Sequence, residues 1–405
     1  MNFTIIKKIT VTNKKDFLNT LKVFNLNKEK NISTLQQTCF IIDYYKKLLT
    51  IKNTDQDTIL TNIFTIKTDL SLPSEEFLVE TKQLFSVLNS CKKMDSLEFT
   101  IGETAIGIGA FMIPVKQFQD FDNGAQFKIS AQDAFDVNRV TNSEDNKNLL
   151  EFKINGDLFI KNIKNSLNFV SNDETRPYLH GVAIKFQENK LGFYATTGHV
   201  LIKINNFDNL DIIDNSNNIF FILPTKLCKS LVASADILKD NIKIIFDNKA
   251  FIKIFSENLK IDAKLIDLEF PPADKIIPRE EWIKIKITTD TKNFIEALKM
   301  ANKIDNDDKN NALEFNLINN DRFLLTKKKQ DNIIFQSPLN ASCQDATDFK
   351  IGLNNKFLLK CIEVYKNFTN ESNIILNFQD TYSPLKIEYA DGNQEITIML
   401  MPIRL

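Results

Sequence analysis

One amphipathic helix pattern occurs three times along the chain. Each copy reads Phe, an aliphatic residue, two variable residues, a second aliphatic residue and Lys, which places one apolar stripe beside a positive charge. The copies begin at Phe17, Phe159 and Phe294, at intervals of 142 and 135 residues. Intervals of this length are those of a domain and not of a solenoid repeat. The sequence therefore predicts three similar domains.

Alternating apolar and polar positions follow each of these helices and predict antiparallel strands. The paired runs are 182–186 with 191–195, 313–317 with 323–326 and, less clearly, 39–42 with 48–51. Further alternation closes the units, at 242–246, 251–255 and 374–378.

A second helix is expected in each copy, and in two of them a proline stands at the first turn. These helices are predicted at 73–88, 224–235 and 354–365. Each unit is then α+β, with two helices on one side of a small antiparallel sheet. Polar, strand-free segments near 142–148 and 278–281 indicate the boundaries. We expect a divergent N-terminal domain at 1–146, a middle domain at 147–280 and a C-terminal domain at 281–405.

Composition limits the chemistry that this protein performs. Of its 405 residues 43% are hydrophobic and 25% are charged, which is typical of a folded protein. The net charge of −1 excludes nucleic-acid binding through bulk positive charge, so any DNA contact must be local. Five separated cysteines and two histidines predict no metal site, and we expect no cofactor. The sequence has no signal peptide and no long apolar span, so we expect a soluble cytoplasmic protein without membrane contact.

Three two-helix units in a chain have the dimensions needed to surround DNA. If two chains formed a ring with the helices inward, about 12 helices spaced ~9 Å apart would line a hole ~24 Å wide. A duplex of about 20 Å fits such a hole. Exposed lysines on the first helices would attract it weakly, although ordinary solvated lysines are an equal alternative. These lysines are Lys22, Lys161, Lys164, Lys292, Lys299 and Lys303.

Four segments carry a resemblance to a known family. They are Asp-Glu-Thr-Arg-Pro-Tyr-Leu-His-Gly at 173–181, Tyr-Ala-Thr-Thr-Gly-His-Val-Leu at 194–201, Phe-Pro-Pro-Ala-Asp-Lys-Ile-Ile-Pro at 270–278 and Met-Pro-Ile-Arg-Leu at 401–405. In this order they resemble the bacterial sliding clamp, the beta subunit of DNA polymerase III. The resemblance is clear in the second and third domains and faint in the first.

This resemblance implies a DNA clamp fold in which two chains join head to tail as a homodimer and close a six-domain ring around duplex DNA. It also implies a non-catalytic processivity factor, loaded by a clamp loader, that takes part in DNA replication. Such a ring tethers the DNA polymerase III catalytic subunit and other replication and repair proteins, and tethering raises their effective concentration at the DNA.

The family binds short linear peptides of its partners in a hydrophobic cleft between the second and third domains. Flexible Met and aliphatic walls suit Leu or Phe anchors from varied partners. By motif, the cleft residues are Leu179, Thr196, Gly198, His199, Val200, Leu201, Pro271, Lys275, Ile276, Met399, Leu400, Met401, Pro402, Ile403 and Arg404. Periodicity alone also fits a last core strand at 396–403.

The family's DNA-facing positions fall on six residues of this chain. They are Lys30, Lys82, Arg176, Pro177, Tyr178 and Lys226. The family has Arg at the first two positions, and Lys keeps the charge but loses the bidentate contact with phosphate. We therefore expect weaker DNA contacts than the family usually makes.

Ring closure is expected to join an apolar strand of the first domain, with Phe111 and Ile113, to Ile304 of the third domain. The family has a second aliphatic residue where this chain has Asp305, which should weaken closure.

Two alternatives remain open at this stage. One is a divergent clamp paralogue that serves a specialised polymerase. The other is a hydrolase that uses Asp173, Glu174 and His199. The basic run at 327–329 is expected at a solvated hairpin end.

Overall fold

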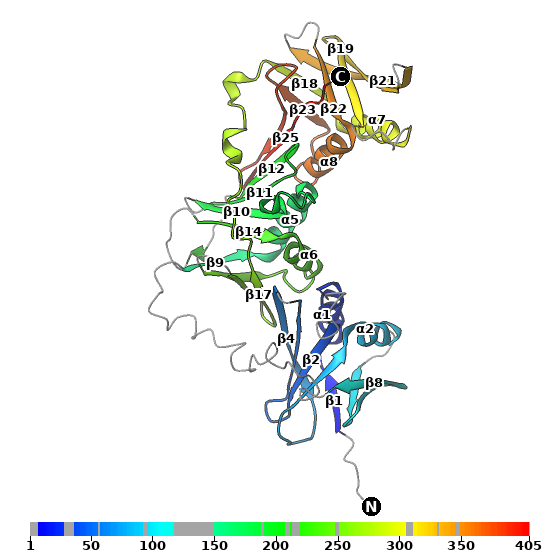
Figure 1. Ribbon diagram of the computed structural model, residues 1–405, viewed down its shortest axis with the longest axis vertical. Coiled ribbons are helices and arrows are strands. Elements are labelled where there is room, and N and C mark those ends of the chain that lie inside the picture. Colours follow the sequence, from blue (N-terminus) through cyan, green and yellow to red (C-terminus); the bar gives the residue numbers. More distant parts are fainter. Residues whose placement is uncertain are drawn as a thin grey trace, which may run out of the picture. The chain divides into compact units, whose positions relative to one another are not determined.

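The computed structural model describes residues 7–27, 36–55, 57–91, 96–116, 149–187, 190–206, 211–212, 219–247, 251–304, 311–329, 332–344 and 349–404. The chain forms two compact units. Figure 1 labels their helices and strands along the chain. The first unit comprises residues 1–161, 210–216 and 226–267, and the second comprises 162–209, 217–225 and 268–405. One continuous antiparallel sheet runs through each unit.

The sheet of the first unit combines strands from the first two repeats. In chain order these strands are β1 (Lys7–Val11), β2 (Gln37–Asp43), β3 (Leu48–Thr54), β4 (Thr58–Lys67), β5 (Glu75–Glu80), β6 (Leu97–Ile101), β7 (Ala105–Ile108), β8 (Phe111–Lys116), β9 (Leu149–Asn155), β13 (Asp211–Ile212), β15 (Asn241–Asp247), β16 (Phe251–Phe255) and β17 (Leu259–Lys264). In the described part of these two repeats the helices are α1 (Lys14–Asn27), α2 (Thr81–Ser90), α5 (Gly156–Ser166) and α6 (Thr225–Ala233).

The sheet of the second unit combines strands from the last two repeats. They are β10 (Gly181–Gln187), β11 (Lys190–Thr196), β12 (Val200–Asn206), β14 (Ile219–Pro224), β18 (Ile285–Asp290), β19 (Ala312–Asn319), β20 (Arg322–Lys329), β21 (Asn332–Gln344), β22 (Lys350–Asn354), β23 (Asn373–Phe378), β24 (Leu385–Ala390) and β25 (Gln394–Leu400). The third repeat adds helices α7 (Thr291–Ile304) and α8 (Asn355–Tyr365). Short 3-10 turns are η5 (Leu167–Phe169), η6 (Pro177–Leu179), η7 (Ala273–Lys275) and η8 (Glu280–Trp282).

The three repeats share one element order. Within the described residues, a strand and a helix are followed in the first and third repeats by four strands, a second helix and three strands, and the second repeat adds only the two-residue strand β13. The predicted α+β class and the threefold repetition are therefore confirmed. The predicted boundary near 142–148 lies outside the described residues.

Strand pairing joins each repeat to the next. At the first junction β4 pairs with β17, with Leu60 opposite Ile261, and at the second junction β12 pairs with β25, with Ile202 opposite Ile398. In both cases the strand that follows the first hairpin of one repeat pairs with the last strand of the next repeat. The backbone hydrogen bonds of the sheet thus continue without a break across each junction.

The phenylalanine that begins each repeated helix pattern lies at the centre of a core. Phe17 of α1 is fully buried and contacts the rings of Phe64 and Phe99, with centroids 5.0 Å and 5.6 Å away. Phe294 of α7 is buried against Phe315 and Phe323 in the third repeat in the same way, at 5.9 Å and 5.7 Å. Edge-to-face pairs of this kind add to the stability gained by burying the rings.

The prediction of a helix over 73–88 was wrong in its first half. Residues Glu75–Glu80 form strand β5, which pairs with β2, and helix α2 begins only at Thr81. Phe77, Leu78 and Val79 are all buried, so pairing within the sheet outweighs the helical pattern read from the sequence. Near the second predicted proline, Pro224 ends strand β14 and α6 begins at the next residue.

The prediction of a solvated basic run was wrong for Lys327, which is almost fully buried. Its ammonium donates hydrogen bonds to Asn311 Oδ1 at 2.7 Å and to the Ala301 carbonyl oxygen at 3.2 Å. Ala301 lies in the last turn of α7, where a cation is favoured by the unpaired carbonyl groups of the helix end. Strand alternation gives neighbouring Lys328 a different environment, and it pairs with Glu314 at 3.2 Å.

Within the described ranges, no helix combines the length and apolar character needed to cross a bilayer. The same part of the chain contains no group of three or more His, Cys, Asp or Glu residues arranged to hold a metal ion.

Candidate functional site

The second strand junction brings together residues that are about 200 positions apart in the sequence. On β12 and β25, Val200 lies opposite Leu400 and Leu201 opposite Met399. The chain then continues beyond β25, and the Met401 amide donates a hydrogen bond to the His199 carbonyl oxygen at 2.8 Å. We call residues Thr196–Leu201 and Met399–Arg404 the junction site.

The tail of the chain is fixed at a second point. The Ile403 amide donates to the Gly352 carbonyl oxygen at 2.9 Å, which adds a bridge to strand β22. Residues beyond Leu400 are therefore held by the backbone of two neighbouring segments, although they leave the regular sheet. The alternative of a last core strand holds only as far as Leu400, where β25 ends.

The predicted cleft residues divide into a buried layer and an accessible layer. The buried layer consists of Leu179, Val200, Leu201, Met399 and Leu400. The exposed positions are Gly198, His199, Lys275, Ile276, Met401 and Arg404, and Thr196, Pro271, Pro402 and Ile403 are half-buried. Apolar side chains such as those of Ile276 and Met401 remain 51% and 40% exposed, which leaves apolar area for a ligand to cover.

The turn between β11 and β12 requires glycine at position 198. Gly198 has φ +90°, a conformation that other residues rarely adopt. A Cβ atom at this position would stand 2.6 Å from Nη1 of Arg176. Within the turn, Thr196 Oγ1 donates to the Val200 carbonyl oxygen at 2.6 Å and accepts from the Gly198 amide at 3.0 Å.

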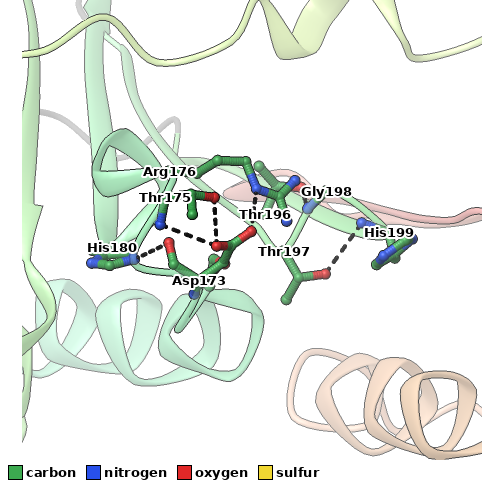
Figure 2. Close-up of polar contacts among 9 residues, drawn as sticks. Asp173, Thr175, Arg176, His180, Thr196, Thr197, Gly198 and His199 are labelled. Atoms are coloured by element: carbon green, nitrogen blue, oxygen red, sulfur yellow. Dashed lines mark hydrogen bonds and ion pairs between the residues drawn. The ribbon is translucent and has the colours of Figure 1, made fainter. Parts of the chain in front are cut away.

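Arg176 is held against this turn by Asp173 (Figure 2). Its Nε donates to Asp173 Oδ2 at 2.7 Å, while the Thr175 hydroxyl and amide donate to Oδ1 at 2.7 Å and 3.1 Å. Hydrogen bonds from Thr175, followed by the bond and charge of Arg176, lower the pKa of Asp173 to about 2. The loop before η6 therefore presents its arginine to the junction site.

The two histidines of the chain have separate surroundings. His180 Nε2 lies 2.6 Å from the Asp173 carbonyl oxygen. The His199 ring stacks on Phe357 at the start of α8, with centroids 6.3 Å apart and an interplanar angle of 22°. Since the Asp173 carboxylate is engaged by Thr175 and Arg176, these contacts give no support to the hydrolase alternative that combined Asp173, Glu174 and His199.

The remaining cleft residues, Pro271, Lys275 and Ile276, lie on the segment 268–284 that precedes β18, which we call the connector. The connector lies on the middle repeat, where Phe270 contacts the rings of Tyr194 and Phe220 at 6.5 Å and 6.0 Å. Asp274 pairs there with Lys203 and Lys185.

Sequence reasoning missed two residues of this region, Phe357 and Asp274. Phe357 gives no local signal, because only the fold brings α8 to the His199 turn. Asp274 gives no local signal either, because its two lysine partners are on separate strands far from it in the sequence.

The predicted DNA residues do not share one environment. Lys82 on α2 and Pro177 on η6 are exposed, and Tyr178 is half-buried. Lys226 on α6 pairs with Asp55 of the first repeat, with 2.8 Å between Nζ and Oδ2. Lys30 lies outside the described residues. The six lysines predicted to attract DNA from the first helices are all exposed.

The residues expected to close the ring differ in exposure. Phe111 and Ile304 are 44% and 47% exposed, but Ile113 is fully buried in its own repeat. On β8 the alternation of side chains turns Ile113 toward the core, so it supports the strand from within. Asp305 lies outside the described residues.

Two protein-family models match more than half of the chain. Residues 153–272 match the model of the DNA polymerase III beta subunit, central domain, and residues 274–404 match the model of its C-terminal domain. The beta sliding clamp of Staphylococcus aureus strain Mu50 is 24% identical over 355 residues, which cover 80% of this chain and 90% of that protein.

Solved structures show the same fold. The beta subunit of DNA polymerase III from Thermotoga maritima has a TM-score of 0.79 at 19% identity, covering 98% of this chain and 100% of that one. The Helicobacter pylori beta clamp bound to a DNA ligase peptide has a TM-score of 0.76 at 18% identity, with the same coverage of 98% and 100%.

The DNA clamp fold predicted from the sequence is therefore confirmed. The function predicted with it, that of a non-catalytic DNA polymerase sliding clamp, is confirmed by the family. Because the two models together match more than half of its residues, the chain belongs to the DNA polymerase III beta subunit family.

Proposed function

We propose that two copies of this chain join head to tail into a ring that encircles duplex DNA and slides along it. The observation that supports this most directly is the rule of strand pairing between repeats. The strand after the first hairpin of one repeat pairs with the last strand of the next repeat, as β4 does with β17 and β12 with β25. The corresponding strand of the third repeat is β21, and the last strand of the first repeat is β8.

Both of these strands have an open edge in the part of the chain that the structure describes. Along 332–340, β21 pairs only with β20, and it reaches β18 only at 341–344. Along 111–114, β8 pairs only with β7, and it meets β5 at Val115 and Lys116. We infer that β21 of one chain pairs with β8 of a second chain. In the same way, β21 of the second chain pairs with β8 of the first.

Exposed apolar side chains accompany these open edges. Phe111 and Met112 lie on β8, and Met300 and Ile304 lie on α7 of the third repeat. Unpaired edge strands with apolar residues are liable to associate, and a closed ring removes such edges. A head-to-tail contact repeated by a twofold axis closes after two copies, which gives the six-domain ring.

A closed ring needs only weak attraction to the DNA. The exposed lysines of the first helices, together with Lys82, would supply it without the tight phosphate contacts that slow movement. We propose Arg176, Pro177, Tyr178 and Lys30 as further DNA contacts, and Lys226 as a contact limited by its pairing with Asp55.

The junction site and the connector are the proposed docking place for short peptides of partner proteins. The Helicobacter pylori clamp has been solved bound to a DNA ligase peptide, which supports this kind of partner for a protein of the same fold. We propose that the DNA polymerase III catalytic subunit, the clamp loader and other polymerases and repair proteins dock here. We also propose domains at 1–146, 147–280 and 281–405, and expect the protein in the cytoplasm, where the chromosome is replicated.

Retention on DNA circles tests the ring. The protein is incubated with a nicked circular plasmid and the cognate clamp loader with ATP, and the bound fraction is measured by gel filtration before and after the circle is cut once. We expect retention on the circle and release after linearisation. Retention that survives linearisation, or absence of retention on the circle, would contradict encirclement.

A further inference from the structure

We infer that Asp274 is a positioning residue that fixes the connector on the middle repeat and thereby sets the place of Lys275 and Ile276 in the partner-binding site. This inference rests on the proposed function, because it concerns residues proposed to hold a partner peptide. It assigns a role to a side chain that lies outside the junction site and outside the predicted cleft residues.

The first observation is a carboxylate shared by two lysines from different strands. Asp274 Oδ1 lies 2.7 Å from Nζ of Lys203 on β12, and Oδ2 lies 3.3 Å from Nζ of Lys185 on β10. Partial burial disfavours the charged carboxylate, but the hydrogen bonds and charges of Lys203 and Lys185 outweigh it and lower the pKa of Asp274. The carboxylate is therefore ionised at neutral pH and bridges two strands that are not neighbours in the sheet.

The second observation is the face of the sheet on which this bridge lies. Register pairs place Lys203 opposite Tyr194 and Lys185 opposite Gly192, so the four side-chain positions share one face. A Cβ atom on Gly192 would stand 2.8 Å from the Tyr194 ring, so glycine leaves the room that this ring occupies. These residues and Asp274 line a pocket of about 260 Å³.

The third observation is an aromatic contact four residues before Asp274 in the same connector segment. Phe270 packs on Tyr194 and Phe220, and the Lys203 ammonium also lies 5.8 Å from the centre of the Tyr194 ring. Asp274 itself lies in the single turn η7, which is closed by a bond from the Ile276 amide to the Ala273 carbonyl oxygen at 3.1 Å. The segment is thus attached by apolar contact at Phe270 and by charge at Asp274.

The consequence concerns the two residues that follow. Lys275 and Ile276 are exposed, and one turn of 3-10 helix is a weak element without outside support. Lys203 stands on the strand that also carries Val200 and Leu201 of the junction site. The ion pair between Asp274 and Lys203 therefore attaches the connector directly to β12. A ligand that contacts both the connector and β12 then binds to segments that are already ordered. Preorganisation of this kind raises affinity by lowering the ordering cost of binding.

Peptide binding by single-site variants tests the inference. The probe is the DNA ligase peptide of the Helicobacter pylori complex, labelled with a fluorophore and measured by anisotropy on the full-length protein. For Asp274→Asn and Lys203→Met we expect affinity to fall about threefold to tenfold at low salt, the range expected for one or two partly exposed ion pairs. Asp236→Asn, which removes the carboxylate of an exposed pair with Lys239, should bind like the unaltered protein.

Four further readouts separate positioning from general stability. Asp274→Glu should recover most of the affinity, and the double variant Asp274→Lys with Lys203→Asp should bind better than either single change. The difference between the unaltered protein and Asp274→Asn should shrink as salt is raised, because the pair is partly exposed. The midpoint of thermal unfolding should stay the same in Asp274→Asn.

The outcomes distinguish this inference from the proposed function. If the unaltered protein does not bind the peptide, the proposed partner site is wrong. If the unaltered protein binds and Asp274→Asn binds equally well at low salt, the partner site stands and the role of Asp274 is wrong. Loss of affinity that accompanies a lower unfolding midpoint, with no recovery in Asp274→Glu, would also overturn the positioning role.

Discussion

Lys226 of helix α6 and Asp55 of the first repeat form an ion pair in which the carboxylate is fully buried and the lysine side chain is 42% exposed. Asp55 Oδ1 also accepts from the Thr58 amide at 2.7 Å, at the start of β4. A lysine proposed to face DNA thus also neutralises a buried carboxylate beside the first strand junction.

Removing Lys226 should destabilise the protein, because Asp55 would remain as a buried charge without its partner. For Lys226→Met we expect the free energy of unfolding to fall by about 1 to 2 kcal/mol, a value reduced for the exposure of the lysine. Urea titration followed by circular dichroism measures it. Lys239→Met, taken from an exposed pair at 3.5 Å, is the matched control and should change stability by less than about 0.5 kcal/mol. Equal losses of unfolding free energy in the two variants would show that the pair with Asp55 contributes no more to stability than an exposed pair.

Gly198 should not tolerate a larger residue. Gly198→Ala adds a methyl group against Arg176 and forces alanine into a backbone conformation that costs about 1 to 3 kcal/mol. We expect lower thermal stability and weaker binding of a partner peptide, measured by calorimetry. Gly392→Ala is the control, because a Cβ atom at that position meets nothing within 4 Å. If Gly198→Ala kept full stability and peptide affinity, the expected clash between the added methyl group and Arg176 would be wrong.

Removal of the last five residues, Met401–Leu405, should abolish binding of partner peptides and leave the dimer intact. The truncation removes the bond from the Met401 amide to His199 and the bond from Ile403 to Gly352, together with the exposed side chain of Met401. The residues proposed for ring closure are on β8, β21 and α7, and they remain. Peptide affinity and sedimentation velocity measure the two effects. Unchanged peptide affinity would show that the tail takes no part in the site.

Asp173 should titrate far below an ordinary aspartate. Its folded-state pKa is lowered to about 2, so its contribution to stability is present above the usual pKa of Asp and is lost as pH falls through about 2. The carboxyl carbon signal in NMR follows this titration. The hydrogen bonds from Thr175 lower the pKa of Asp173 more than Arg176 does. Arg176→Gln should therefore raise this pKa only part of the way toward that of an ordinary aspartate. A midpoint near 4 in the unaltered protein would contradict the contacts of this loop.

Freeing Arg176 from Asp173 should strengthen DNA binding. In Asp173→Asn the guanidinium loses its charged partner, and we expect affinity for a short duplex to rise about twofold or more at low salt. Glu174→Gln removes the same charge from the neighbouring exposed position and serves as the control. If the two variants gain equally, the gain comes from net charge, and Arg176 is not a DNA contact.

Ring closure should depend on Phe111. Phe111→Asp places a charge on the open edge of β8, and we expect sedimentation at low micromolar concentration to show monomer where the unaltered protein shows dimer. Tyr382→Asp removes an aromatic residue that is 89% exposed elsewhere and should leave the dimer unchanged. Monomer alone in the unaltered protein would count against closure.

Several features followed from the sequence because they depend on local order. The helix pattern beginning at Phe17, Phe159 and Phe294 requires an apolar stripe to pack wherever it occurs, and all three phenylalanines are buried. Each of the nine alternating runs read from the sequence likewise falls within a strand, although they cover fewer than half of the described strands, and the segments at 173–181, 194–201, 270–278 and 401–405 carried the family resemblance before any contact was known. The helix expected over 73–88 shows the limit, since the pairing of β5 with β2 is a contact between distant segments.

The tertiary structure alone decided how side chains from distant segments meet. No local pattern shows that Lys327 is buried at the end of α7, that His199 stacks on Phe357, or that Asp274 joins Lys203 to Lys185. The sequence determined that three similar α+β units exist, because helix and strand periodicity act over a few residues. The pairing of β4 with β17 and of β12 with β25 was decided by the fold, because hydrogen bonds between strands depend on which edges come together in space.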